Sequence, residues 1–493
     1  MRETAELRQW LTTGAGAVKR ARGRLDSINV FPVADADTGT NIYLTLREGN
    51  RAVSQLTAEA THREVVAAFV RGALLGARGN SGVIVSAYLA EFLGTIDGHG
   101  GLADASAEHI ADALDQASVA AYDSVGAPVE GTILTVAREA ADAALESARA
   151  GVSREGVLVA AVVGARAALA RTQSLLPAAR DAGVVDAGAA GLVLQLEMLA
   201  ETIGGEGVLD AIDDVDWELD DSHVHRGVES GFEVMFVAHS RNDLRRALTA
   251  RLDAIGTSVT LTGAHGVWQA HVHTERPGEA VKVAASAPAS HIVVRGLDDH
   301  AADEATSVVA LTTCPGLADA LAEAGAIVVV VPRPADVTNK EIKRALRGAA
   351  GRAAIVVAGE PSLLAVALKV AAERRRPSLT VLDAGHEAHV VAAVAASALA
   401  TPGQDLAAVM AESIANTAVG DSSEDALDED VDRLISARTE MVTLILGRGV
   451  DPAIADSVRL SVGTVAPRAD VAVYEGYQAG PPILVGVENS AAS

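Results

Sequence analysis

The segment Asn29-Val-Phe-Pro-Val-Ala-Asp-Ala-Asp-Thr-Gly-Thr-Asn41 holds two carboxylates, Asp35 and Asp37, between a proline turn and a Gly39-Thr40-Asn41 step. Closely spaced oxygen ligands suit Mg²⁺, which takes one or two carboxylates and leaves its other positions to water and phosphate oxygens. Taken alone, an Asp-X-Asp pair is more often a solvated turn that caps the next helix. The metal interpretation therefore depends on the segments that follow.

A glycine-rich segment, Gly76-Ala-Arg-Gly-Asn-Ser-Gly82, directly precedes the apolar run Val83–Leu89. Its glycines let backbone N–H groups approach an anion closely, and Ser81 can cap the helix that follows. The segment thus predicts a phosphate site at a helix N-terminus, although an ordinary loop between two helices explains it equally well. It is not a Walker A loop, because it has no Gly-Lys step.

Two shorter segments follow. Glu130-Gly-Thr-Ile-Leu134 places Thr132 at an expected helix start, and Val185-Asp-Ala-Gly-Ala-Ala-Gly191 places Asp186 before a glycine turn. Each alone is more often helix packing or capping. The four segments, in this order, resemble the ATP-binding L-subunit (DhaL) domain of dihydroxyacetone kinases, in the version carried by bacterial fatty acid kinases of the FakA type. The resemblance covers residues 1–205.

The resemblance implies an antiparallel α-helical barrel whose loops at one end hold ATP through Mg²⁺. Asp35 and Asp37 would be Mg²⁺ ligands, and we assign Asn29 as the third, because the family's third carboxylate is missing at its usual spacing. Arg78 is the candidate that neutralises developing charge. Ala36 replaces the family's usual glycine, and we expect little effect. The other candidate nucleotide contacts are Thr38, Asn41, Gly79, Asn80, Ser81, Gly82, Thr132, Asp186 and Gly188.

The composition limits the classes of function. With 493 residues, the chain is long enough for about three domains, and aromatic residues make up only 3%, so the core must consist mainly of Ala, Val and Leu. A net charge of −25 argues against nucleic acid and anionic membrane surfaces as partners. The single cysteine, Cys314, excludes an internal disulfide and a multi-cysteine zinc site.

The charged N-terminal sequence predicts no signal peptide, and no apolar run reaches the length of about 20 residues that a membrane helix needs. We therefore expect a cytoplasmic protein without integral membrane association.

Changes in hydrophobic periodicity predict four parts. Residues 1–205 have helical periodicity, and residues 206–227 form an acidic linker. Residues 228–303 predict a small α+β sandwich. Residues 304–493 alternate strands and helices, which indicates an α/β domain with a parallel sheet covered on both faces. Within it, the acidic run 421–432 predicts an exposed loop. The predicted fold class is multidomain α and α/β.

The middle domain contains His271-Val-His273 on a predicted strand. Residues two apart on a strand project from the same face, so both imidazoles point together, as a zinc site requires. A pair of surface or core-edge histidines is the alternative. By the resemblance, a cysteine of an earlier strand completes a Cys-His-His site, and Glu233 stands in its place here. Since carboxylates also bind zinc, Glu233, His271 and His273 are a candidate Zn²⁺ site.

The resemblance implies a phosphotransferase that uses Mg-ATP to phosphorylate the carboxylate of a fatty acid held by a separate fatty-acid-binding partner protein, giving an acyl phosphate. Two alternatives stay open: a kinase of a small hydroxyl substrate such as dihydroxyacetone, and a nucleotide-binding regulatory scaffold without turnover. The C-terminal domain resembles that partner protein more loosely, with Thr312, Thr313 and Asn339 as candidate ligand contacts. We also expect a homodimer.

Overall fold

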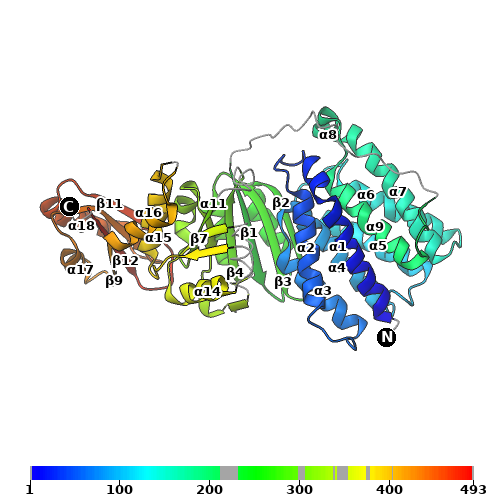
Figure 1. Ribbon diagram of the computed structural model, residues 1–493, viewed down its shortest axis with the longest axis horizontal. Helices are drawn as coiled ribbons and strands as arrows, with labels where there is room; N and C mark the ends of the chain where they lie inside the picture. Colours follow the sequence, from blue (N-terminus) through cyan, green and yellow to red (C-terminus); the bar gives the residue numbers. More distant parts are fainter. Residues whose placement is uncertain are drawn as a thin grey trace. The chain divides into compact units, whose positions relative to one another are not determined.

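The protein is described by a computed structural model (Figure 1), which covers residues 3–210, 231–297, 306–336, 339–340, 343, 353–373, 378–401 and 403–490. The chain forms two compact units: Met1–Ser230 with His239–His273, and Gly231–Ala238 with Thr274–Ser493. Most of the predicted acidic linker lies outside the described residues. The four-part division stays a prediction.

Helices α1 to α9 form the first part of the chain and confirm the predicted helical domain. Helix α1 contacts α2 and α9, and the ring continues from α2 through α4, α5, α6 and α7 to α9. Figure 1 shows these helices side by side. Their bounds are α1 Glu3–Ser27, α2 Thr38–Val53, α3 His62–Gly76, α4 Gly79–Gly98, α5 Ala107–Asp123, α6 Ile133–Arg149, α7 Arg154–Leu175, α8 Pro177–Ala182 and α9 Ala187–Gly204.

Small side chains fill the interior of this helical barrel. The fully buried residues of α5, α6 and α7 are largely alanines, which let neighbouring helix axes approach closely. The ring closes at α1 and α9, where Trp10 Nε1 donates a 3.0 Å hydrogen bond to Gln195 O and Gln195 Nε2 donates one of 3.0 Å to Gly14 O. The predicted core of Ala, Val and Leu is therefore confirmed. Over the described residues, no helix has the length and apolar character needed to span a membrane.

The sheet strands that follow are joined in one eight-stranded sheet of order β2-β3-β1-β4-β6-β5-β7-β8. The pairs β2–β3, β1–β4 and β4–β6 are antiparallel, whereas β6–β5, β5–β7 and β7–β8 are parallel. The strands are β1 Phe232–His239, β2 Thr257–Ala264, β3 Val267–Thr274, β4 Ala289–Gly296, β5 Ser307–Thr312, β6 Ile327–Val330, β7 Ala353–Ala358 and β8 Ser378–Val381. Because β4 pairs with β6, the antiparallel strands expected in a separate sandwich continue into the expected parallel sheet.

The helices of this region connect the strands. They are α10 Arg245–Asp253, α11 Pro277–Ser286, α12 Ala318–Glu323, α14 Pro361–Ala372 and α15 Glu387–Leu399. Helix α14 packs on β7 and β8, and α15 packs on β5 and β7. The parallel part of the sheet thus has the βα connections predicted from the sequence.

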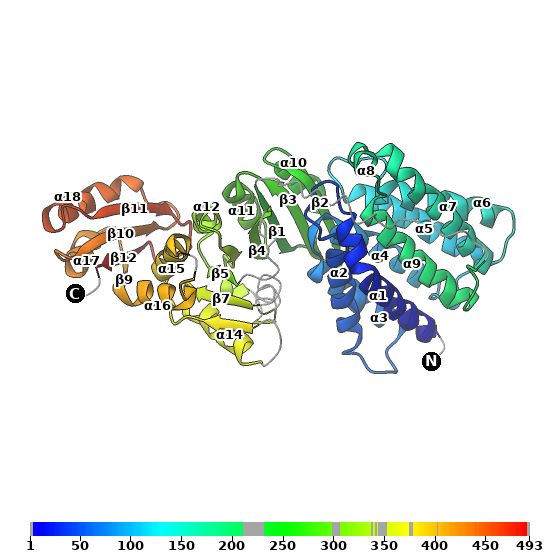
Figure 2. The same ribbon diagram turned by 45° about the horizontal axis from the view of Figure 1, so that its top comes forward.

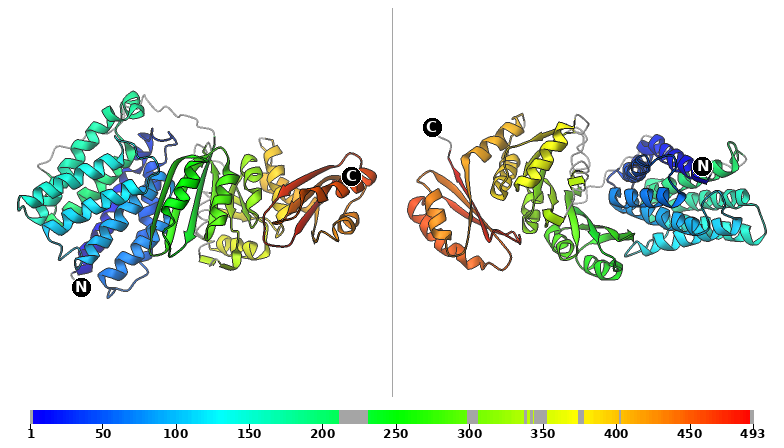
Figure 3. Two further views of the ribbon diagram at one scale, coloured as in Figure 1. Left: turned by 180° about the vertical axis from the view of Figure 1, so that it is seen from behind. Right: turned by 90° about the horizontal axis from the view of Figure 1, so that it is seen from below.

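The last part of the chain forms a second sheet of order β11-β10-β12-β9, which is mixed rather than parallel. Helices α17 and α18 pack on this sheet and share one hydrophobic core with it. Helices α15 and α16 contact each other and the strands, but they do not belong to that core (Figure 3). The expected loop at 421–432 is wrong in part, because α17 buries Leu427 and Val431 and leaves its acidic residues outside. The bounds are α16 Leu406–Asn416, β9 Thr417–Ser422, α17 Leu427–Leu434, β10 Thr439–Leu446, α18 Ala455–Val465, β11 Asp470–Glu475 and β12 Ile483–Asn489.

Candidate nucleotide and metal sites

Each of the four segments singled out in the sequence ends at the N-terminus of a barrel helix. Asp37 is the N-cap of α2, Arg78 that of α4, Thr132 that of α6 and Asp186 that of α9. The first N–H groups of a helix have no partner within the helix, and the helix dipole places partial positive charge there. The segments therefore supply four potential anion-binding ends.

The N-termini of α2 and α4 are in direct contact. Ser81 Oγ lies 3.3 Å from Thr38 Oγ1, within hydrogen-bond distance. Gly79 has φ +55°, and a Cβ at this position would overlap Asn41 Nδ2. Only glycine combines this conformation with so close an approach. The glycine-rich segment thus packs on the first turn of α2, next to the Asp-X-Asp loop.

The N-termini of α6 and α9 are joined through Asp186. Its buried carboxylate accepts a 2.7 Å hydrogen bond from the N–H of Ala189 and another from the N–H of Ile133, at the start of α6. Burial raises the pKa of Asp186 to about 6, although the two hydrogen bonds act to lower it. The glycine turn predicted after Asp186 is wrong, because these residues form the start of α9. A Cβ at Gly188 would lie 3.5 Å from Ile133 Cβ, so the first turn of α9 also packs against α6.

Helix α9 also contacts α2, since a Cβ at Gly191 would lie 2.6 Å from Ile42 Cδ1. Contacts therefore run from α4 to α2, from α2 to α9 and from α9 to α6, all near helix N-termini. The ends of α6 and α9 already hold the carboxylate of Asp186. The ends of α2 and α4, beside the Asp-X-Asp loop, are the ones that favour a ligand with several negative charges, such as a polyphosphate.

Hydrogen bonds order the Asp-X-Asp loop. Asn29 Nδ2 donates to Asp35 Oδ1, and Asn29 Oδ1 accepts a 2.9 Å hydrogen bond from Thr38 Oγ1. Because the Thr38 proton is used in this way, Ser81 is the donor in the contact between the two hydroxyls. One polar chain thus runs from Asp35 through Asn29 and Thr38 to Ser81. The role of Asn29 as a metal ligand stays a prediction.

A further carboxylate, Asp26, lies beside this loop. It accepts hydrogen bonds of 2.8 Å from both the N–H and the hydroxyl of Thr40. Burial raises the pKa of Asp26, and the negative charge of Asp37 raises it further. Two carboxylates close enough to repel each other are the environment that a divalent cation stabilises.

The remaining predicted residues lie in the same loops or in the first helical turns that follow them. Thr132 Oγ1 donates a 2.7 Å hydrogen bond to Val129 O and accepts one from the N–H of Leu134, so it caps α6. Arg78 and Asn80 are half-buried, and Gly82 is buried. Ala36 has φ +55°, a region that costs a non-glycine residue about 1–2 kcal/mol. The glycine usual at this position in the family therefore has a conformational reason.

The sequence analysis missed a contact from the β strands to the glycine-rich segment. Thr260 Oγ1, on β2, donates a 3.1 Å hydrogen bond to Asn80 Oδ1. The loop after α5 pairs with the same strand, because Gly126 N donates to Val259 O at 2.9 Å and Leu261 N donates to Ser124 O at 2.7 Å. Figure 2 shows β2 beside the barrel helices, in agreement with its contacts to α3 and α4. No local signal marks Thr260.

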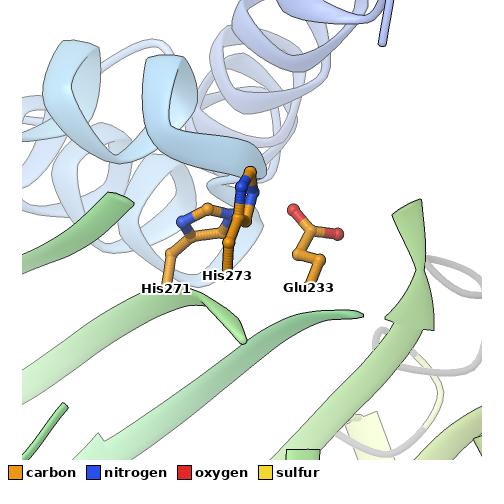
Figure 4. A group of neighbouring side chains, drawn as sticks. All are labelled: Glu233, His271 and His273. Atoms are coloured by element: carbon orange, nitrogen blue, oxygen red, sulfur yellow. The ribbon is translucent and has the colours of Figure 1, made fainter. Parts of the chain in front are cut away.

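The predicted zinc residues converge in the sheet (Figure 4). One ligand atom each from Glu233, His271 and His273 lies within 4.8 Å of the others, and all three residues are buried. The imidazole rings are 4.8 Å apart. Across the described part of the chain, this is the one group of three or more His, Cys, Asp and Glu residues that meets this spacing. Strands β3 and β1, which carry them, are neighbours.

A backbone carbonyl orients one of these imidazoles. His271 Nδ1 lies 3.3 Å from Ser258 O, and since a carbonyl only accepts, Nδ1 carries the proton. His271 would then bind a metal through Nε2, with the carbonyl as the usual outer partner. Ser258 has φ +54° at a register irregularity of β2, which directs its carbonyl to the ring. Two neutral imidazoles and one carboxylate fit a zinc ion that keeps a fourth position open.

Comparisons with known proteins agree with this arrangement. Residues 32–201 match the DAK2 domain, residues 229–300 match the middle domain of FakA-like fatty acid kinase proteins, and residues 416–488 match their C-terminal domain. The matched segments are thus a DAK2 domain followed by a middle domain and a C-terminal domain. The chain is therefore similar to the FakA-like fatty acid kinase proteins over these three segments.

Protein YloV of Bacillus subtilis is 33% identical over 294 residues, which is 56% of this chain and 52% of that protein. An uncharacterized protein of Staphylococcus epidermidis is 32% identical over 280 residues, or 54% of this chain and 50% of the relative. An uncharacterized protein of Staphylococcus saprophyticus is 30% identical over 283 residues, or 55% and 50%. The chain therefore spans about half the length of these relatives.

Proposed function

We propose that this chain is an ATP-dependent kinase component that transfers the γ-phosphoryl group to the carboxylate of a fatty acid presented by a separate binding protein. The products are an acyl phosphate and ADP. The main support is the contact between the N-termini of α2 and α4 beside Asp35 and Asp37, since phosphoryl transfer depends chiefly on positioning and charge neutralisation. The matches to kinase-related domains support the same class of reaction.

In this proposal Asp35 and Asp37, with Asn29, would hold Mg²⁺, which would neutralise negative charge on the phosphates of ATP. The N–H groups of Gly79, Asn80 and Ser81 would support phosphate oxygens, whereas the N–H of Gly82 already donates to Arg78 O. Arg78 would stabilise the charge that develops during transfer. An oxygen of the fatty acid carboxylate forms the new bond to the γ-phosphorus, while the bond to the β–γ bridging oxygen breaks. No catalytic base is needed, because the acceptor is already ionised.

A separate carrier for the acyl chain agrees with the packing of the barrel. Its described interior is filled with Ala, Leu and Val side chains, most of them less than 5% exposed. A long acyl chain would have to displace this core, which would cost far more than its own transfer from water provides. Only the carboxylate end of the substrate then needs to reach the helix N-termini.

We further propose that Glu233, His271 and His273 bind Zn²⁺, that water takes the fourth position, and that the bound ion stabilises the fold. Burial of a carboxylate and two imidazoles in one cluster supports this assignment, since such groups are retained inside a protein when they are paired or bind a metal.

The kinase proposal is tested by ADP release from Mg-ATP in the presence of oleate and a purified lipid-binding partner. We expect turnover that D35A and D37A abolish and that D142A, an exposed aspartate of α6, leaves unchanged. Transfer to dihydroxyacetone without the partner would replace the proposal with a small-substrate kinase. Tight ATP binding without turnover on either substrate would replace it with a regulatory scaffold.

A further inference from the structure

The carboxyl end of β5 holds a buried carboxylate that none of the preceding chemistry uses. Glu387 Oε2 accepts a 2.6 Å hydrogen bond from Thr312 Oγ1. Glu387 Oε1 accepts hydrogen bonds of 2.7 Å from both the N–H and the hydroxyl of Thr313. Thr312 and Thr313, which the sequence suggested as ligand contacts, therefore do bind a carboxylate, and it belongs to the chain itself. The third candidate, Asn339, is exposed.

The surroundings are shaped for this group. Glu387 is 2% exposed, and a Cβ at Gly359 would overlap Glu387 Oε2, so the residue after β7 must be glycine. Cys314 N donates a 3.0 Å hydrogen bond to Thr312 Oγ1, which fixes the lone pairs of this hydroxyl and turns its proton towards Glu387. Three donors thus point at two carboxylate oxygens from one strand end. Burial raises the pKa of Glu387, and the hydrogen bonds from Thr312 and Thr313 oppose that rise.

The location is one at which ligands bind. Strands β5 and β7 are parallel neighbours, and open α/β sheets bind ligands beyond the carboxyl ends of such strands. Glu387 reaches this place from the first turn of α15, where the helix dipole also favours a negative charge. The donors at this place are two hydroxyls and one backbone N–H, and none of them is a cation. Such donors select a small planar anion whose two oxygens accept hydrogen bonds.

We propose that the end of β5 is a carboxylate-binding site that this chain fills with its own Glu387. The side chain acts as an internal ligand that joins α15 to β5, 75 residues earlier. An external carboxylate can enter only when the carboxylate of Glu387 is removed. The inference does not depend on the kinase proposal, because all of its residues lie in the second compact unit.

The test uses the full-length E387A variant, since this substitution removes one CH₂ and one carboxylate, the atoms of acetate. We expect its melting temperature to fall by about 5 °C or more. Sodium acetate at pH 7.5 should restore at least about half of this loss, whereas sodium chloride at the same ionic strength should not. Acetate should have no such effect on the wild type, where the site is filled, or on E387A/T312V, where a donor is missing.

A matched control is E360A, because Glu360 caps α14 through the N–H groups of Ser362 and Leu363 without being buried. Acetate should not restore the melting temperature that E360A loses. Equal responses of E387A and E360A, or no response of E387A, would overturn the proposal. If E387A does not fold, the yield of refolded E387A is compared with and without acetate. A higher yield with acetate supports the proposal, and an equal yield overturns it. E387Q should then still fold, because an amide keeps its oxygen for Thr313 and can donate to Thr312; failure of E387Q to fold would also overturn the proposal.

Discussion

Replacement of Asp186 by asparagine should change how stability depends on pH. Burial raises the pKa of this carboxyl from 3.8 to about 6, so the native state holds the proton more strongly than the unfolded chain does. The resulting stabilisation is fully present below pH 3.8 and is lost as the pH rises through 6. Its upper limit is about 3 kcal/mol, and about 1 kcal/mol of it is lost between pH 5.5 and pH 8.

Asparagine cannot ionise, and it caps helices as well as aspartate does. The free energy of unfolding of D186N, relative to wild type, should therefore rise by about 1 kcal/mol from pH 5.5 to pH 8. Loss of one acceptor for the N–H of Ile133 adds a constant destabilisation, which cancels in this comparison.

Urea unfolding followed by far-UV circular dichroism at several pH values measures this difference. The control is D405N, because Asp405 caps α16 through the N–H groups of Ala407 and Ala408 at the surface. Parallel pH profiles for D186N and wild type would refute the claim that burial of Asp186 disfavours its ionised form.

Three other predictions concern the neighbouring groups. A36G should raise the free energy of unfolding by about 1 kcal/mol, because it relieves a left-handed alanine, and an unchanged or lower value in chemical denaturation would contradict this. T260V should weaken nucleotide binding about tenfold by releasing Asn80, whereas T260S and the neighbouring T262V should bind as wild type does; equal titration curves for all would exclude this role. Removal of metal by a chelator should lower the melting temperature of the wild type but not of H273A, and unchanged melting of the stripped wild type would count against structural zinc.

The sequence predicted the features that depend on local chemistry. Capping residues such as Thr132 and Asp186 mark helix starts, because they must satisfy N–H groups within the next three residues. His271 and His273 share one face, because side chains alternate between the two faces of a strand. That these groups meet at a barrel end and in a cluster was expected from the family resemblance, and the structure brings them together.

Contacts between distant segments were not predictable in this way. Asn80 and Thr260 are 180 residues apart, and either side chain alone is unremarkable for a loop or a strand. The joining of the two expected sheets depends on the pairing of β4 with β6, whose apolar residues fit a buried strand in either sheet. Glu387 gave no signal, because an acidic residue in the first turn of a helix is ordinary.

The kinase proposal requires Asp35, Asp37 and the N-termini of α2 and α4 to bind a magnesium–triphosphate. This binding is measured by isothermal titration of a non-hydrolysable ATP analogue into wild type, D35N and D37N, with and without Mg²⁺. We expect Mg²⁺-dependent binding to the wild type and at least about tenfold weaker binding to each variant. Binding that is indifferent to Mg²⁺, or equal in all three proteins, would contradict the proposal.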